Sequence, residues 1–446
     1  MPTTATGKTP IVSRALLVPF VLVTSLFALW GFANDLTNPM VSAFKKVLEL
    51  DNTQASYVQF AFYFGYFTMA LPAAIFAQRF SYRKAIVLGL VLYAAGALLF
   101  YPAAALENYG FFLAALYILT FGLAFLETTA SPYVLELGAE ETAVQRLNLA
   151  QAFNPIGALS GLIVAKTFIL EALQSDEIGA EAYAALDESA RAAIRTSDLG
   201  VISGPYITLG VFLIVMVVLF LVVKMPEKLG DTAAPVMPAI RRLWAQPKFA
   251  GGVIAQAFYV GAQIMCWTYV YQYAESLDID NATAVYYAVA ALVIFLVGRF
   301  AGTALLSYFS SGKLLLLFSL GAGACILGTM FVVGQAGLYA LVATSFFMSI
   351  MFPTIYGIAL EGQREDAKFG AAFLVMAIVG GALMPVLQGK ILDAGGPGYT
   401  DTLIAGVPEV NFSFVLPLLC FVVTAIYGWL VHSRFRHSPA TPRITP

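Results

Sequence analysis

Charged side chains are scarce in this chain of 446 residues, since lysine, arginine, aspartate and glutamate together make up only 11%. Soluble domains carry about 25% of these residues. Hydrophobic residues make up 60% of the chain, and the mean hydropathy is +0.82. This composition excludes an ordinary soluble protein and predicts one that crosses a membrane many times.

Histidine and cysteine are also rare. The two histidines, His432 and His437, fall in the polar C-terminal segment, so any proton relay inside the membrane must use carboxylates. The three cysteines, Cys266, Cys325 and Cys420, lie inside apolar runs without a partner at short spacing. That spacing matches neither a disulfide framework nor a metal site. We therefore expect three small packing residues, no metal and no cofactor.

Signals for several function classes are missing. The net charge is −2 and no basic stripe occurs, so we expect no nucleic-acid partner. The phosphate-binding pattern G-x-x-x-x-G-K-[ST] does not occur, so ATP is not the expected energy source. No nucleophile with a neighbouring base stands out, and we predict that the protein is not an enzyme.

Long apolar runs fill most of the sequence. Crossing about 30 Å of hydrocarbon takes about 20 helical residues, and only helices or closed barrels can cross it. The runs are continuous rather than alternating, so we predict an all-α membrane protein with twelve transmembrane helices in two six-helix bundles. The first run lacks a cleavage site and is interpreted as a span rather than a signal peptide. The runs fall near 15–47, 55–79, 84–104, 110–137, 146–173, 204–224, 250–276, 283–306, 313–333, 338–360, 369–393 and 410–432.

The gap between the sixth and seventh runs is the longest basic break in the chain. We predict an N-terminal bundle at 1–224, a cytoplasmic linker at 225–249, and a C-terminal bundle with a short cytoplasmic tail at 250–446. Lysines and arginines such as Arg83 and Arg146 concentrate on the inner side of this topology. Both termini are then cytoplasmic, in a bacterial inner membrane. On the outer side, the alanine-rich stretch 180–194 favours a short surface helix.

Two groups of six spans are typical of secondary transporters, which bind substrate near the bilayer midplane between paired repeats. One acid lies in the middle of such a span: Glu127 is the only charged residue within 111–134. A carboxylate at that depth costs about 2.5–3.5 kcal/mol on insertion scales. Because lost hydration disfavours its charged form, exposure to each side in turn would load or release a proton. We predict that Glu127 carries the coupling proton; the alternative is a carboxylate permanently paired to fix helix packing.

The first span holds a second acid among amides. Asn34 and Asn38 share a helical face, and Asp35 precedes Asn38 by one turn. We predict that Asp35 assists in proton coupling, and that Trp30, Asn34 and Asn38 contact substrate. The alternatives for Asp35 are a structural role in a broken helix and a position at the outer membrane surface.

Amides and aromatic residues recur at helical spacing in two further spans. Gln151 and Asn154 are three residues apart in the fifth span, and Tyr259, Gln263 and Trp267 recur at spacings of four in the seventh. Amides can hydrogen-bond to hydroxyl groups, and aromatic rings stack on the apolar face of a sugar. We predict that these residues line a sugar site; amides that merely hold helices together are the alternative.

Arg299 stands alone within the eighth span, toward its inner end, between the glycines of a G-x-x-x-G motif at 298–302. A contact to substrate and an anchor at the inner membrane surface are equally supported. We include Arg299 in the predicted substrate site.

Several short motifs characterise one group of transporters. They are L-W-G at 29–31, L-E-T at 126–128, R-L-N-L-A-Q at 146–151, Y-V-G-A-Q at 259–263 and F-P-T-I at 352–355. With further matches along nearly the whole chain, the sequence resembles the fucose permease family of the major facilitator superfamily.

The resemblance implies a twelve-helix bundle that imports a sugar together with a proton by alternating access. It also implies coupling through two acids: a span-four glutamate, matched by Glu127, and a span-one aspartate. The sequence departs at the second position, where Asn38 stands, and Asp35 occupies a family asparagine position one turn earlier. Either the displaced acid preserves proton coupling, or Asp35, Asn38 and Glu127 bind Na⁺. The family's amide positions map onto Gln151 and Asn154.

The predicted function is therefore a secondary active transporter that imports a fucose-, galactose- or glucose-like monosaccharide by symport with a proton. Sodium symport is the rival within the class, and efflux of amphipathic compounds is more distant. A non-transporting membrane sugar sensor is the rival from another class, but it would need an output domain, and the segment after His432 is short. The expected partners are one monosaccharide and the lipid bilayer, and the resemblance implies a monomer.

Overall fold

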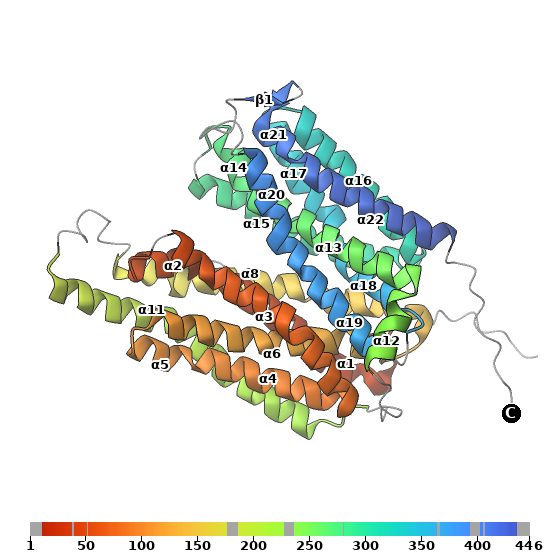
Figure 1. The fold of residues 1–446 in the computed structure, drawn as a ribbon, viewed down its shortest axis with the longest axis horizontal. Helices are drawn as coiled ribbons and strands as arrows, with labels where there is room; N and C mark the ends of the chain where they lie inside the picture. The colour runs from red at the N-terminus through yellow and green to blue at the C-terminus, as the bar shows by residue number, and fades with distance from the viewer. Residues whose placement is uncertain are drawn as a thin grey trace, which may run out of the picture. The chain divides into compact units, whose positions relative to one another are not determined.

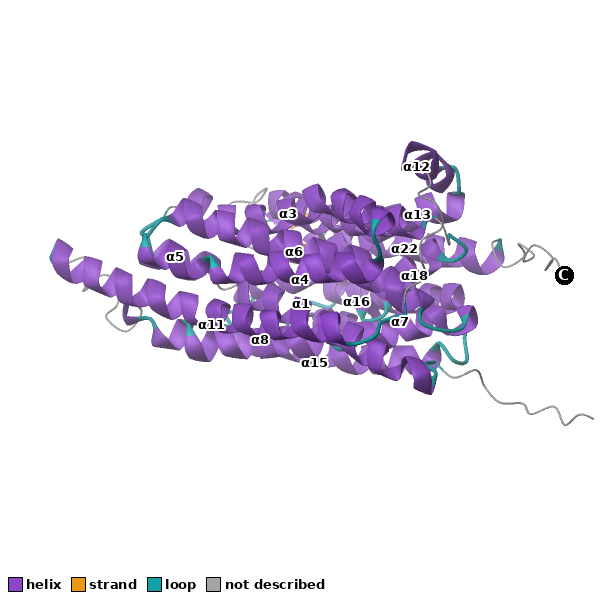
Figure 2. Cartoon of the chain, turned by 90° about the horizontal axis from the view of Figure 1, so that it is seen from below, coloured by secondary structure: helices purple, strands orange, loops and turns teal. Residues whose placement is uncertain are grey.

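The computed structural model describes residues 11–37, 40–50, 52–175, 186–226, 236–279, 281–363, 366–392, 402–404 and 406–434. Nearly all of this part of the chain is helical (Figure 2). Twelve stretches in it are long and apolar enough to cross a membrane, which confirms the predicted fold class. They are Arg14–Thr37, Phe60–Arg79, Tyr82–Ala105, Tyr109–Glu136, Glu140–Phe168, Glu188–Val222, Pro247–Glu275, Thr283–Leu305, Ser311–Phe331, Gln335–Leu360, Ala367–Leu392 and Glu409–Ser433.

Several spans consist of two helices joined by a short break, and short helices lie between spans. The elements up to the sixth span are η1 (Arg14–Leu16), α1 (Leu17–Thr37), α2 (Met40–Val47), α3 (Asn52–Arg79), α4 (Tyr82–Leu98), α5 (Phe100–Ala105), α6 (Tyr109–Glu136), η2 (Glu140–Thr142), α7 (Ala143–Gln151), α8 (Asn154–Phe168), η3 (Leu170–Ala172) and α11 (Glu188–Val222).

The second half also combines long and short helices, and it adds one small β-hairpin. Its elements are α12 (Val236–Trp244), α13 (Pro247–Thr268), α14 (Val270–Glu275), α15 (Asn281–Leu305), α16 (Ser311–Phe331), α17 (Gln335–Met348), α18 (Met351–Leu360), α19 (Ala367–Met376), η4 (Ala377–Val379), α20 (Gly380–Leu392), β1 (Leu403–Ile404), β2 (Val407–Pro408), α21 (Glu409–Ser413) and α22 (Val415–Ser433). The two strands pair antiparallel.

By packing, the chain divides into two compact units. Unit 1 consists of Met1–Ala139, Ala150–Val236 and Ala367–Met376, and unit 2 consists of Glu140–Leu149, Met237–Asp366 and Ala377–Pro446. Within unit 1, α4 lies against both α6 and α11 (Figure 1). Most of α7 therefore packs in unit 2, and α19 packs in unit 1 against α3 and α6. These two units are defined by packing and not by chain order, so they do not test the predicted bundle boundaries at 224 and 250, which stay a prediction.

Close backbone approach joins α1 to α8. A Cβ added at Gly157 would collide with the carbonyl oxygen of Ala28, and one added at Gly161 with that of Phe32. A Cβ added at Gly31 would likewise collide with the backbone of α8. Because glycine has no side chain, these positions let the two helices touch along their backbones.

The predicted surface helix at 180–194 is wrong in its described part. Residues 188–194 form the first two turns of α11, which continues without a break for 35 residues. The carboxylate of Asp187 caps this helix by accepting the Ala190 backbone N–H at 2.7 Å. The alanine-rich stretch has high helix propensity, so it extends the span instead of forming a separate helix.

Arg146 was expected among the charges of the inner loops, but the structure buries it completely in α7. Its Nη1 donates to the Thr142 hydroxyl at 3.1 Å. In unit 2, Gln145 Nε2 donates to the Thr303 carbonyl at 3.2 Å, and Asn148 Nδ2 to the Thr354 hydroxyl at 3.3 Å. These contacts hold the start of span five against α15 and α18 and cover Arg146.

Candidate functional site

The Glu127 side chain is only 2% exposed, in the middle of α6. Neither carboxylate oxygen has a hydrogen-bond partner among the described residues, and no described basic side chain forms an ion pair with it. A buried carboxyl without a donor or a cation is expected to be neutral. This environment suits a group that binds and releases a proton.

Hydroxyl groups surround this acid along α6. The helix continues through Pro132, and the Thr129 hydroxyl donates to the Phe125 carbonyl at 2.6 Å. The hydroxyls of Thr128 and Ser131 are buried without a partner in the described part of the chain. Unsatisfied polar groups this deep in an apolar helix are costly, which points to a functional rather than a packing role for the segment.

On α1, the side chains of Trp30, Asn34 and Asp35 are all half-buried. The predicted site residue Asn38 lies outside the described residues. The Asp35 carboxylate interacts electrostatically with Tyr63 of α3. The half-burial of Asp35 shows that neighbouring residues partly cover its side chain, and its role in coupling stays a prediction.

Gln151 and Asn154 flank the break between α7 and α8. Gln151 is buried at the end of α7, and Asn154 is half-buried at the start of α8. The amide nitrogen of Asn154 donates to the Phe27 carbonyl of α1 at 3.2 Å. One N–H of the Asn154 amide thus links α8 to α1, as expected if these amides hold helices together. In unit 1, α1 packs on both α6 and α8, and a Cβ added at Gly31, next to Trp30, would collide with the Asn154 carbonyl oxygen.

In unit 2, α13 positions three of the predicted residues. Tyr259 is fully buried and its hydroxyl donates to the Met348 carbonyl at 2.9 Å. Trp267 is half-buried, and its indole N–H donates to the Ser345 hydroxyl at 3.2 Å. Gln263 lies one turn before Trp267 and is half-buried as well. This helix face carries an amide and an aromatic ring that are only partly covered, as a sugar site requires.

Arg299 is buried inside unit 2, with only 4% of its surface exposed. Its guanidinium carbon lies 4.9 Å from the centre of the Phe295 ring, and the side chain interacts electrostatically with Tyr259. Phe295 also meets the Trp267 ring edge-on, with centroids 5.1 Å apart. A buried arginine stacked on an aromatic ring is not an exposed inner-end anchor, and its contact with substrate stays a prediction.

Four residues of these two clusters were not singled out from the sequence. Phe295 contacts both Trp267 and Arg299, and the Ser345 hydroxyl accepts the Trp267 indole N–H. Tyr63 and Tyr66 are electrostatic neighbours of Asp35 and Glu127, respectively. The spacing of Phe295 to Arg299 is four and that of Tyr63 to Tyr66 is three, so helical periodicity could have indicated both pairs. Ser345 gives no such signal in the sequence.

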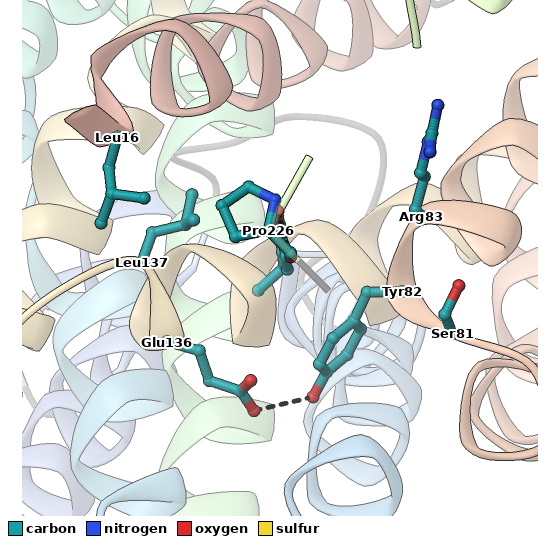
Figure 3. A pocket seen from close by; sticks show the side chains of 8 residues that line it. Leu16, Ser81, Tyr82, Arg83, Glu136, Leu137 and Pro226 are labelled. Atoms are coloured by element: carbon teal, nitrogen blue, oxygen red, sulfur yellow. Dashed lines mark hydrogen bonds between the residues drawn. The ribbon is translucent and has the colours of Figure 1, made fainter. Parts of the chain in front are cut away.

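A separate pocket of about 150 Å³ lies at the far end of α6 (Figure 3). Glu136, on its wall, is nine residues beyond Glu127, about 13 Å along the helix axis. The Tyr82 hydroxyl donates to Glu136 at 3.3 Å and the Tyr133 hydroxyl to the Pro226 carbonyl at 2.9 Å. These polar groups are already engaged, so the pocket is distinct from the predicted site and we assign it no ligand.

Comparisons with known proteins give consistent relatives. The pattern of the Major Facilitator Superfamily matches residues 23–385. An L-fucose-proton symporter of Haemophilus influenzae is 52% identical, over 94% of this chain and 97% of the relative. An L-fucose-proton symporter of Escherichia coli is 37% identical, over 96% and 95%. A glucose/galactose transporter of Brucella abortus is 31% identical, over 91% and 92%.

Solved structures agree with these relatives. A crystal structure of the transporter FucP in the outward conformation matches with a TM-score of 0.83 at 35% identity, covering 94% of this chain and 99% of that one. The proton:xylose symporter XylE matches with a TM-score of 0.68 at 13% identity, covering 93% and 95%. The second likeness is one of fold alone.

Proposed function

Since the chain belongs to the Major Facilitator Superfamily, in its fucose permease family, we propose that it imports a monosaccharide by symport with a proton through alternating access. The observation that carries this proposal is Glu127, a buried acid without a fixed partner in the described residues. The relatives named L-fucose-proton symporters support proton coupling and give no support to the sodium alternative. A sensor or an efflux pump has no support from either source.

We propose that Glu127 and Asp35 share the coupling role. Loading a proton neutralises an acid, which lowers the cost of enclosing it when the site closes. Releasing the sugar and the proton on the inner side leaves the acid deprotonated, and the empty transporter returns to the outer side in this form, so that each cycle carries one proton inward with the sugar. The membrane potential contributes about 2.3 kcal/mol per charge per 100 mV.

We propose L-fucose as the first sugar to test, because both fucose relatives cover nearly the whole chain. On the protein side, the amide of Gln263 and the rings of Trp267 and Phe295 can receive the hydroxyls and the apolar face of a hexose. In unit 1, Trp30, Asn34, Gln151 and Asn154 stay predicted sugar contacts on their sequence positions. Asn38 is included on its sequence position.

We further propose that the protein lies in a bacterial inner membrane as a monomer with both termini in the cytoplasm. The positive-inside distribution of lysine and arginine supports this orientation. A cysteine placed in the linker at 225–249 should react with a membrane-impermeant reagent only after the cells are opened. Reaction in intact cells would reverse the orientation.

The function itself is tested by counterflow in liposomes with L-fucose, D-galactose, D-glucose and L-arabinose. Uptake is then compared under an imposed pH gradient and an imposed Na⁺ gradient. We expect L-fucose uptake under the pH gradient alone. Uptake driven only by Na⁺ at equal pH would overturn proton coupling, and the absence of counterflow by every sugar would overturn sugar transport.

A separate experiment tests whether Asp35 replaces the span-one aspartate of the family, which this sequence lacks at position 38. Asp35→Asn removes the acid and keeps the volume, so we expect loss of pH-driven accumulation. In the same background, Asn38→Asp restores an acid at the position where the resemblance places it. Recovery of accumulation in the double variant would show that the acid can move by one turn without loss of coupling, whereas full activity of Asp35→Asn alone would remove Asp35 from the scheme.

A further inference from the structure

The short helix α12, which precedes span seven, has one largely exposed face with an unusual composition. Met237 is 62% exposed and Trp244 is 43% exposed, although both side chains are large and apolar. Arg241 is exposed between them. Spacings of four and three residues place these three side chains on one face of the helix. Ala239 and Leu243 are fully buried on the other side, so α12 packs on unit 2 through one face only.

Polar contacts fix which face of α12 points away from the protein. The Arg242 guanidinium donates to the Asp366 carboxylate through Nε at 2.9 Å and through Nη2 at 2.7 Å. Just beyond the helix, the Gln246 amide nitrogen donates to the side-chain oxygen of Gln363 at 3.0 Å. A bidentate pair of arginine and carboxylate restricts orientation as well as distance. The helix therefore cannot turn its exposed face toward unit 2 without breaking these contacts.

The exposed face lies near the level of a membrane surface. Span seven begins at Pro247, three residues after Trp244, so the two Cα atoms are at most about 11 Å apart. Figure 2 shows α12 at this end of span seven, beside the start of α13. The headgroup layer on each side of the hydrocarbon is about 5–8 Å deep, and tryptophan is enriched in it. The Trp244 ring is therefore within reach of this layer.

The charge of the segment around α12 has one sign. No acidic residue occurs within 232–274. Of its basic side chains, Arg242 is neutralised by the ion pair described above and Lys248 by an ion pair with Glu361. No described carboxylate forms an ion pair with Arg241. One uncompensated positive charge thus lies between two exposed apolar side chains.

We propose that the exposed face of α12 binds anionic phospholipid, with Arg241 at the phosphate of the headgroup and with Met237 and Trp244 against the upper part of the acyl chains. A helix with apolar and basic side chains at the membrane surface is complementary to such a lipid. A neutral lipid would leave Arg241 without a counter-charge, and an acidic protein segment would not need a site at the membrane surface. The assignment to the inner leaflet rests on the proposed orientation of the termini, whereas the binding does not depend on sugar transport.

The fluorescence of Trp244 tests the proposal with the full chain in phosphatidylcholine vesicles. The vesicles contain a minor share of either brominated phosphatidylglycerol or brominated phosphatidylcholine, with bromine near the headgroup end of the acyl chain, where it quenches tryptophan on contact. The chain has four tryptophans, so the signal of Trp244 is the difference between the wild type and Trp244→Phe. We expect both lipids to quench Trp244, with phosphatidylglycerol bound about fivefold more strongly. Fivefold corresponds to about 1 kcal/mol, which is the contribution of one basic side chain near an anionic membrane surface.

Two substitutions separate the local charge from the net charge. In Arg241→Gln, we expect the preference for phosphatidylglycerol to disappear to within twofold while the quenching itself remains. Arg195→Gln is the matched control, because it changes the net charge equally, and Arg195 belongs to unit 1 and pairs with Glu188 at 3.3 Å. We expect the wild-type preference in this control. Added salt should weaken the preference of the wild type and leave Arg241→Gln unchanged.

Three results would overturn the proposal. Equal binding of the two brominated lipids by the wild type would remove the recognition of charge. Absence of Trp244 quenching by either lipid would mean that water or another protein covers this face. A preference that persists in Arg241→Gln would assign the selectivity to other basic groups. None of these outcomes bears on sugar import, which counterflow tests separately.

Discussion

Replacing the buried acid of α6 by its amide separates accumulation from exchange. Glu127→Gln keeps the volume and removes the proton site, and neither side-chain oxygen has a partner to lose in the described residues. One proton moving across 100 mV supplies about 2.3 kcal/mol, and about 1.4 kcal/mol corresponds to a tenfold ratio. Wild-type protein should therefore accumulate sugar up to about 40-fold, and the variant should reach a ratio of about one.

The assay uses proteoliposomes with a potassium diffusion potential of 100 mV, inside negative, at equal pH on both sides. Exchange of labelled sugar is measured on the same preparation, and we expect Glu127→Gln to retain it. Glu136→Gln is the matched control, because Glu136 lies on the same helix but bonds to Tyr82 at the edge of a separate pocket. Accumulation above tenfold by Glu127→Gln would refute the assignment, and loss of exchange would assign the residue to folding.

Two further predictions concern stability. Gly157→Ala should lower the free energy of unfolding by about 1–3 kcal/mol, and the melting temperature with it, because the new Cβ collides with the Ala28 carbonyl oxygen. Gly200→Ala is the control: nothing lies within 4 Å of the added Cβ, so the melting temperature should rise or stay unchanged. The pKa of Asp187 lies below its ordinary value because the Ala190 backbone N–H donates to its carboxylate. Its stabilisation of the first turn of α11 should thus be full above about pH 4 and be lost as the pH falls further. Amide hydrogen exchange should show this loss in the wild type and not in Asp187→Asn, and equal pH dependence in both would contradict it.

The membrane spans could be predicted because run length and continuity of apolar residues are local properties. Twelve runs predicted twelve spans, but the first span ends at Thr37 instead of residue 47 and the sixth begins at Glu188 instead of residue 204. The breaks inside spans do not follow from the length of the apolar runs, although Pro155 in the first turn of α8 is a local signal for the break between α7 and α8. The length of α11 was also missed, because the polar cap at Asp187 lies outside the apolar run that it extends.

The identity of the site residues follows from chemistry that is rare in lipid, as with Glu127 and Arg299. Partners on other spans cannot be predicted in this way, because they are distant in sequence: the Tyr259 hydroxyl donates to the Met348 carbonyl. The contact of Arg299 with Phe295 is different, since the two residues are one turn apart on α15. Arg146 shows the same limit, since a charge at the end of a span is predicted to be solvated unless the helices that cover it are known. The roles of the residues in coupling and sugar contact stay predictions.

The glycine contacts between α1 and α8 have a mechanical consequence. Because no side chains separate the two backbones at these glycines, we expect α1 and α8 to tilt and slide together as one rigid unit. These two helices carry Trp30, Asp35 and Asn154, so we expect the distances among the three side chains to stay constant while other helices rearrange. The predicted substrate contacts on α1 and α8 would thus form a preorganised surface that stays intact through the transport cycle and does not have to reassemble at each turnover.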